Sequence, residues 1–122
     1  MIKGEVFVVD DEPGVRLLLS EVIRRENYNV TTYERSDRAF TEALTKLPQI
    51  IFLDYLMEPW RGDEVIRRLN EESADIPVVL MSGMAEQELR DHLGDAEVFD
   101  VIEKPFSVEQ IHQILEGLNV KI

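Results

Sequence analysis

The chain has no cysteine among its 122 residues, so disulfide bonds and thiolate metal sites are excluded. No apolar run approaches the roughly 20 residues of a membrane-spanning helix, and the first residues lack the pattern of a signal peptide. Basic residues are also scarce, with 13 against 25 acidic residues and a net charge of −12. A domain this acidic is not expected to bind a nucleic-acid backbone directly. We therefore expect a cytoplasmic domain that contacts neither a membrane nor nucleic acid.

Short apolar runs alternate with segments in which apolar residues recur every three or four positions. This alternation predicts βαβ units and a parallel sheet. The expected strands are Glu5–Val9, Asn29–Tyr33, Gln49–Leu53, Pro77–Met81 and Val98–Ile102. The first expected helix has Pro13 in its first turn, the second has Ser36 as its N-cap, and the third starts near Asp63. The fourth runs from Ala85 to Leu93, and the fifth starts at a capping box of Ser107 and Gln110. We predict one domain over residues 1–122, a doubly wound (βα)5 α/β fold of flavodoxin-like strand order 2-1-3-4-5.

Charged residues stand where several of these strands end. Asp10 and Asp11 follow the first strand, Asp54 follows the third, and Lys104 lies just after the fifth. Ligand sites of open parallel sheets form outside the carboxyl ends of the strands, so these side chains are expected to meet at one edge. Crowded carboxylates repel one another and favour a bound cation. The pattern predicts a divalent-metal site around one reactive aspartate.

Each of these residues also has a simpler interpretation. Asp10 or Asp11 could cap the following helix or interact with its dipole. Lys104 could be an ordinary surface lysine, and Ser82, after the fourth strand, could be a turn hydroxyl.

Four motifs in order carry a resemblance to a known family. They are "VVDDEP" at 8–13, "IIFLDYLM" at 50–57 with Gly62 eight residues after Asp54, "VVLMSG" at 78–83, and "EKPF" at 103–106. Together they cover essentially the whole chain, and each lies at an expected strand end. The sequence resembles the receiver, or phosphoacceptor, domain of two-component response regulators.

The resemblance implies a role for each strand-end residue. Asp54 would be the phosphoacceptor, Lys104 would pair with the phosphoryl oxygens, and Ser82 would be the hydroxyl that bonds the acyl phosphate. The implied ligands of Mg²⁺, with Mn²⁺ as the alternative ion, are Asp11 directly, Asp10 through water, Asp54, and the backbone carbonyl of Leu56.

The resemblance also implies a signalling switch rather than a turnover enzyme. A histidine kinase or a histidine phosphotransfer protein would donate the phosphoryl group, and the domain would catalyse its own phosphorylation and slow hydrolysis. The acyl phosphate would then change the surface formed by the helix at 85–93, the strand at 98–102 and the helix after Ser107. That surface would bind a downstream partner, an output domain or a second copy of the chain. No output domain is expected within residues 1–122.

The sequence departs from the family pattern near the site and in the fifth strand. Glu58 stands where proline is usual, Pro59 follows, and Trp60 replaces a smaller apolar residue. We expect Trp60 to pack on the following helix, with a role in covering the site or binding a partner as the alternative. Val101 stands where an aromatic residue usually follows the switch hydroxyl, and the neighbouring aromatic is Phe99. The usual aromatic switch is therefore in doubt, whereas phosphorylation itself is expected to persist.

Three alternatives remain open. A pseudo-receiver would fold in the same way and bind partners without phosphotransfer. A phosphatase of the haloacid-dehalogenase type also uses a strand-end aspartate, but Leu56 stands where its second aspartate would lie. A flavin binder would need a first loop that cradles phosphate, and the acidic "DDEPG" at 10–14 would repel one.

Overall fold

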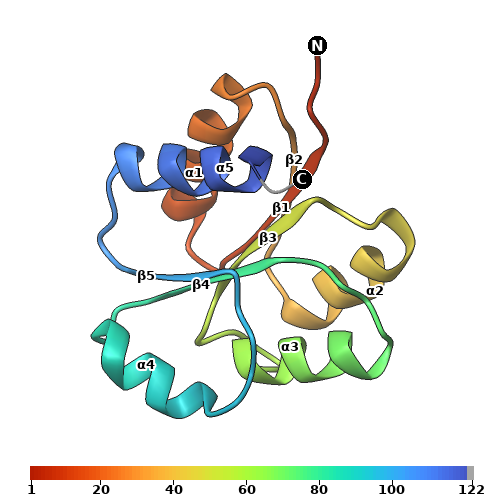
Figure 1. Ribbon diagram of the computed structural model, residues 1–122, viewed down its shortest axis with the longest axis vertical. Coiled ribbons are helices and arrows are strands. Elements are labelled where there is room, and N and C mark those ends of the chain that lie inside the picture. Colours follow the sequence, from red (N-terminus) through yellow and green to blue (C-terminus); the bar gives the residue numbers. More distant parts are fainter. Residues whose placement is uncertain (121–122) are drawn as a thin grey trace.

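A computed structural model describes residues 1–120, and five strands alternate with five helices along them (Figure 1). The strands are β1 (Glu5–Val9), β2 (Asn29–Tyr33), β3 (Ile50–Asp54), β4 (Val78–Ser82) and β5 (Asp100–Glu103). The helices are α1 (Pro13–Arg25), α2 (Ser36–Lys46), α3 (Gly62–Glu71), α4 (Glu86–Leu93) and α5 (Val108–Val120). The predicted alternation is confirmed, and the last two residues of the predicted domain lie outside the described part of the chain.

The sheet is parallel throughout, with the strand order β2-β1-β3-β4-β5. This confirms the predicted flavodoxin-like topology. Val9 of β1 lies beside Leu53 of β3, so Asp10 and Asp54 emerge next to each other at the carboxyl edge. At the same edge, Asp54 lies beside Met81 of β4.

Helices cover both faces of the sheet (Figure 1). On one face, α1 and α5 lie together, and Leu19, Ile23, Ile111 and Leu115 pack on the sheet with an exposed fraction of 1% or less. On the other face lie α2, α3 and α4, whose buried apolar side chains are Ala39, Ala43, Val65, Ile66, Leu69, Leu89 and Leu93. The central strands β3 and β4 are buried at every residue, because both of their faces are covered.

Three strands extend one residue further than their apolar runs predict, including β5, which ends at Glu103 rather than Ile102. The structure places Asp54 within β3 and Ser82 within β4, each one residue beyond the predicted end. Backbone hydrogen bonds carry the ladder to these residues: the Tyr55 amide donates to the Met81 carbonyl at 2.9 Å, and the Lys104 amide donates to the Ser82 carbonyl at 2.7 Å. Backbone pairing does not depend on side-chain polarity, so the apolar pattern underestimates these strands.

The other ends of the elements are corrected by one or two residues. β3 and β4 begin at Ile50 and Val78, one residue later than predicted, and β5 begins at Asp100 rather than Val98. Helix α4 begins at Glu86, with Ala85 at its N-cap.

The helix expected near Asp63 begins at Gly62. Of the three starts predicted from a specific capping or first-turn residue, two are confirmed. Pro13 occupies the first turn of α1. Ser107 and Gln110 form the predicted capping box, with reciprocal hydrogen bonds of 2.8 and 3.2 Å. The prediction for Ser36 is wrong, because Arg35 holds the N-cap position and Ser36 is already helical. The Ser36 hydroxyl instead accepts a hydrogen bond from the Trp60 amide, 24 residues further along the chain.

Within residues 1–120, every helix is too short or too polar to cross a bilayer.

Gly62 supports the loop that leaves the carboxyl end of β3. Its amide donates to the Tyr55 carbonyl at 2.8 Å. A Cβ atom at this position would lie 2.5 Å from a methyl group of Leu80 and 3.2 Å from the Cα of Tyr55. The loop can therefore close against β4 only because residue 62 has no side chain.

We expect Gly62→Ala to lower the free energy of unfolding by about 1–3 kcal/mol, because the added methyl group overpacks the contact with Leu80 and the Tyr55 backbone. Urea unfolding measures the change. The control is Gly83→Ala, since a Cβ at Gly83 meets no atom within 4 Å. Equal stability of the two variants would contradict the close approach at Gly62.

Candidate functional site

Residues from three strand ends meet at the carboxyl edge of the sheet. Asp10 follows β1 and is fully buried, Asp54 ends β3 and is 7% exposed, and Lys104 follows β5. The Nζ atom of Lys104 donates to Oδ2 of Asp10 at 2.7 Å and lies 3.6 Å from Oδ2 of Asp54. Residues separated by up to 94 positions are thus joined through one ammonium group.

Hydrogen bonds that involve the backbone hold both Asp10 and Lys104 in place. The other oxygen of Asp10 accepts a hydrogen bond from the Glu12 amide at 2.9 Å, and the Asp10 carbonyl accepts one from Arg16 at 2.8 Å. The Lys104 amide is held by the Ser82 carbonyl. The ammonium group therefore approaches the carboxylates from a backbone position set by the sheet.

Lys104 is charged and surrounded by acids. Burial would lower its pKa, but the hydrogen bonds to Asp10 and Glu12 and the charge of Asp54 raise it above the usual value. Its contact with Glu12 Oε1 measures 3.1 Å. Lys104 therefore supplies a permanent positive charge that three carboxylates share.

The environment of Asp54 disfavours its charged form. Burial raises its pKa from 3.8 to about 6, against the opposing charge of Lys104, and the negative charges of Asp10 and Asp11 add to the rise. A hydrogen bond from the Leu56 backbone acts in the other direction. An ionised Asp54 at neutral pH is thus held in an unfavourable site, which a further cation would stabilise.

Asp10, Asp11 and Glu12 form an acidic cluster whose carboxylate oxygens can lie within 4.8 Å of one another. Asp10 is buried, whereas Asp11 and Glu12 are exposed. Carboxylate oxygens are hard donors of the kind that Mg²⁺ prefers, and Mg²⁺ retains several waters when it binds few protein ligands. The exposed side of this cluster leaves room for such waters. The donor set fits a hydrated divalent cation.

Ser82 and Leu56, predicted at this site, lie on its border. Ser82 is 2% exposed, and its hydroxyl accepts a hydrogen bond from the Met84 amide at 3.0 Å, which connects the end of β4 to the segment before α4. The side chain of Leu56 is 60% exposed, while its backbone contacts Asp54.

The other predicted residues, Trp60, Val101 and Phe99, pack in other parts of the molecule than the site formed by Asp10, Asp54 and Lys104. Trp60 is partly buried, with the Arg68 guanidinium 3.9 Å from its ring centre and the Phe40 ring 5.6 Å away, so the expected packing on α3 is confirmed and extends to α2. Val101 is 4% exposed, lies beside Leu80 of β4, and belongs to the core on the face covered by α2, α3 and α4. Phe99 is partly buried against the core on the face covered by α1 and α5.

Three residues that the sequence predictions missed contribute to the site. Glu12 binds Lys104, Arg16 holds the Asp10 carbonyl, and Ser36 binds the loop after Asp54. Glu12 follows the two predicted aspartates directly, so the strand-end argument could have included it. The contacts of Arg16 and Ser36 depend on tertiary structure and leave no local signal.

The comparisons with known proteins agree with this geometry. The family model for the response regulator receiver domain matches residues 6–116. The chain therefore belongs to the receiver domains of two-component signalling.

Its relatives include regulators from several bacteria. The nitrogen assimilation regulatory protein NtrX of Azorhizobium caulinodans is 31% identical over 92% of this chain and 25% of its own length. The transcriptional regulatory protein ResD of Bacillus subtilis is 34% identical over 88% of this chain and 44% of its own length. The chain thus spans less than half of either regulator.

A solved structure shares both the fold and part of the sequence. The beryllofluoride-activated NtrC4 receiver domain dimer superposes with a TM-score of 0.85 at 26% identity, and the match covers 93% of this chain and 94% of that one.

The raised pKa of Asp54 predicts a pH-dependent cost to stability. The folded state holds a proton on Asp54 more tightly than the unfolded state, so stability falls as the pH rises from about 4 through 6. Asp54→Asn removes this cost. In the absence of divalent cations, the unfolding free energy gained by the variant over wild type should be larger at pH 7.5 than at pH 4 by about 2 kcal/mol.

Urea unfolding at the two pH values tests this expectation. Asp95→Asn, at an exposed position away from the site, controls for the loss of one negative charge. A gain from Asp54→Asn that is the same at both pH values would show that the Asp54 carboxylate is not penalised in the folded state.

Proposed function

We propose that this domain is a phosphorylation-activated switch in which Asp54 accepts a phosphoryl group in a Mg²⁺-dependent reaction. The observation that carries the proposal is the contact of Lys104 with both Asp10 and Asp54 beside an acidic cluster. A nucleophilic carboxylate, a fixed cation and a set of hard oxygen donors are the groups that phosphoryl transfer requires.

The donor in this proposal is a phosphohistidine of a histidine kinase or a phosphotransfer protein. An oxygen of the Asp54 carboxylate attacks the phosphorus atom, the phosphorus–nitrogen bond breaks, and the released imidazole takes up a proton. The product is an acyl phosphate on Asp54. Water later cleaves it slowly, so the domain acts as a phosphoacceptor and not as a turnover enzyme.

The residues proposed to hold Mg²⁺, or Mn²⁺ in its place, are Asp10, Asp11, Asp54 and the backbone carbonyl of Leu56. The bound ion would neutralise the charge on the phosphoryl oxygens. Lys104 would exchange part of its contact with Asp10 for the new phosphoryl oxygens, which carry more negative charge than the carboxylate they join.

Ser82 would transmit the change to α4. Its hydroxyl now accepts from the Met84 amide. If the hydroxyl turned to donate to the acyl phosphate, the segment between β4 and α4 would lose or alter that contact. The two arrangements differ in a few polar contacts, as expected of a two-state element that a ligand can bias.

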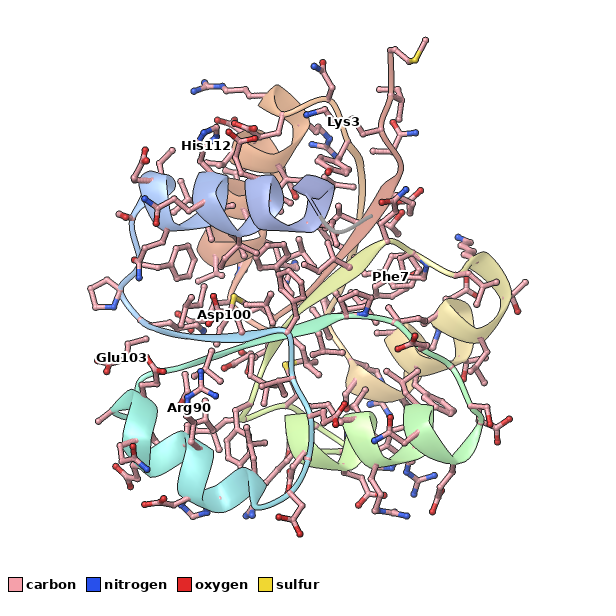
Figure 2. The ribbon with its side chains drawn as sticks, in the orientation of Figure 1. Lys3, Phe7, Arg90, Asp100, Glu103 and His112 are labelled. Carbon is pink, nitrogen blue, oxygen red and sulfur yellow. The ribbon has the colours of Figure 1, made fainter. Side chains whose placement is uncertain are left out.

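The output surface in this proposal lies on α4, β5 and α5. A groove of about 470 Å³ there is lined by residues that include Glu86, Val101 and Ile114. The Glu86 amide donates to the Glu103 carboxylate at 2.9 Å, and Figure 2 shows Arg90 of α4 directed toward the strand of Asp100. With Val101 in place of an aromatic residue, movement of α4 would change these polar contacts rather than an aromatic rotamer.

An exposed apolar surface beside Lys104 supports a protein as the phosphodonor. Leu17 and Leu18 of α1 are 63% and 46% exposed. Leu18 also borders a hollow whose other lining residues include Pro105, Phe106 and Lys104. A donor seated there would lie next to the Asp54 site. Such a surface is costly to expose to water unless a partner covers it.

The downstream partner is proposed to be an output domain, a separate protein or a second copy of the chain. The NtrC4 relative forms a receiver domain dimer, which favours testing a homodimer. The pseudo-receiver remains the alternative function, since the fold alone would serve an interaction module.

We expect the intact mass of the wild-type domain to increase by one phosphoryl group after incubation with acetyl phosphate and Mg²⁺. The increase should disappear when EDTA removes the metal, because the crowded carboxylates then repel the donor. It should also disappear in Asp54→Asn and persist in Asp95→Asn, which removes the same charge elsewhere.

Two results would contradict the proposal. A mass increase that survives in Asp54→Asn would place the phosphoryl group on another residue. No increase with either acetyl phosphate or a phosphorylated histidine phosphotransfer protein would favour the pseudo-receiver.

A further inference from the structure

The loop between β3 and α3, residues 55–61, is attached to α2 through Ser36. The Ser36 hydroxyl accepts a hydrogen bond from the Trp60 amide at 2.9 Å. The Ser36 amide donates to the Glu58 carbonyl at 3.1 Å. One residue therefore binds the loop at two points, through its side chain and its backbone.

Ser36 is enclosed by the protein. Its exposed fraction is 0%, although it is the first residue of a helix, a position that usually faces solvent. A buried hydroxyl or amide without a partner costs free energy, so the bond between Ser36 and the Trp60 amide satisfies two groups that water reaches poorly. The Ser36 hydroxyl therefore serves the loop and does not cap α2, because Arg35 occupies the N-cap position.

The side chain of Trp60 reinforces the same attachment. Its ring lies edge-on to Phe40 of α2, with ring centres 5.6 Å apart, and stacks beneath the guanidinium of Arg68 of α3. Both helices thus hold the distal half of the loop. The bond from the Gly62 amide to the Tyr55 carbonyl joins the two ends of the loop.

Leu56 lies between these two fixed points. Its side chain is largely exposed and contributes little packing, yet its backbone contacts the carboxylate of Asp54. The Leu56 backbone is therefore held by its buried neighbours Tyr55 and Met57, which are 3% and 4% exposed, and by the attachment of the loop at Ser36, rather than by its own side chain. Ser36 contacts no residue of the acidic cluster, but it fixes the segment that follows Met57 through its bonds to Glu58 and Trp60.

We propose that Ser36 is a positioning residue for phosphoryl transfer, which holds the Leu56 backbone against Asp54 through the β3–α3 loop. The part that concerns phosphoryl transfer rests on the proposed function. Misplacement of a reacting group by about 1 Å can cost up to about a hundredfold in rate, and Ser36 acts at a distance, so we expect a smaller effect.

The test compares Ser36→Ala with Ser20→Ala. Ser20 is also a buried helical serine, 4% exposed, but lies on α1. At saturating Mg²⁺, Ser36→Ala should slow phosphorylation by acetyl phosphate about tenfold, whereas Ser20→Ala should match the wild type. Urea unfolding confirms that both variants are folded under the assay conditions.

Amide hydrogen exchange supplies a readout that does not depend on phosphorylation. In the wild type, the Trp60 amide should be strongly protected; in Ser36→Ala, the Trp60 and Leu56 amides should both exchange faster, with the core strands unchanged. A general loss of stability would raise exchange in the strands as well, so the pattern separates positioning from folding.

The outcomes distinguish this inference from the function on which it rests. A wild type that is not phosphorylated contradicts the proposed function, while the exchange pattern still decides whether Ser36 holds the loop. A wild type and a Ser36→Ala variant that react at the same rate overturn the positioning role. Fast exchange of the Trp60 amide in the wild type would overturn the attachment itself.

Discussion

The structure at the carboxyl edge of the sheet depends on one ammonium group shared by acidic side chains. Lys104 contacts Asp10, Glu12 and Asp54, which come from the ends of two different strands. Without that charge, the parallel sheet would bring the carboxylates together with nothing to offset their repulsion. The net charge of −12 makes the local balance more demanding. The strand order brings the carboxylates together, and the charge of Lys104 offsets only part of their repulsion.

Part of the negative charge remains uncompensated at Asp54. Burial and the neighbouring charges raise the pKa of Asp54 to about 6 even with Lys104 beside it. An additional cation is therefore favoured, and the acidic cluster at residues 10–12 offers it oxygen ligands. A phosphoryl group that arrives with such a cation would change the distribution of charge around Lys104 and Ser82. Membership of the receiver family is consistent with this use of an acidic strand edge.

Much of this arrangement could be predicted from the sequence because it follows from backbone topology. Once the alternation of apolar runs and helical patterns is read as a parallel sheet, Asp10, Asp54 and Lys104 must emerge at one edge. The extension of β3 through Asp54 and of β4 through Ser82 was missed, because backbone pairing continues past the apolar residues. The sequence could not indicate the role of Ser36 either. A serine before a helical pattern looks like an N-cap, and only the folded chain brings the Trp60 amide to its hydroxyl.

The departures from the family pattern fall on the segments that link the site to the rest of the molecule. Trp60 joins the loop after Asp54 to α2 and α3, and Val101 leaves β5 with a small buried side chain where an aromatic residue is usual. In the proposed function, Trp60 would act through the loop that carries Leu56, whereas Val101 would affect transmission through β5.

In the proposed function, the acidic edge binds one divalent cation next to Asp54. The decisive measurement is a titration of the metal-free domain with Mg²⁺, followed by two-dimensional amide NMR. We expect saturable shifts that fit a single site, are largest for Asp11, Asp54, Leu56 and Lys104, and are greatly weakened in Asp11→Asn. Shifts that do not saturate, or that spread over the acidic surface with no maximum at these residues, would contradict it.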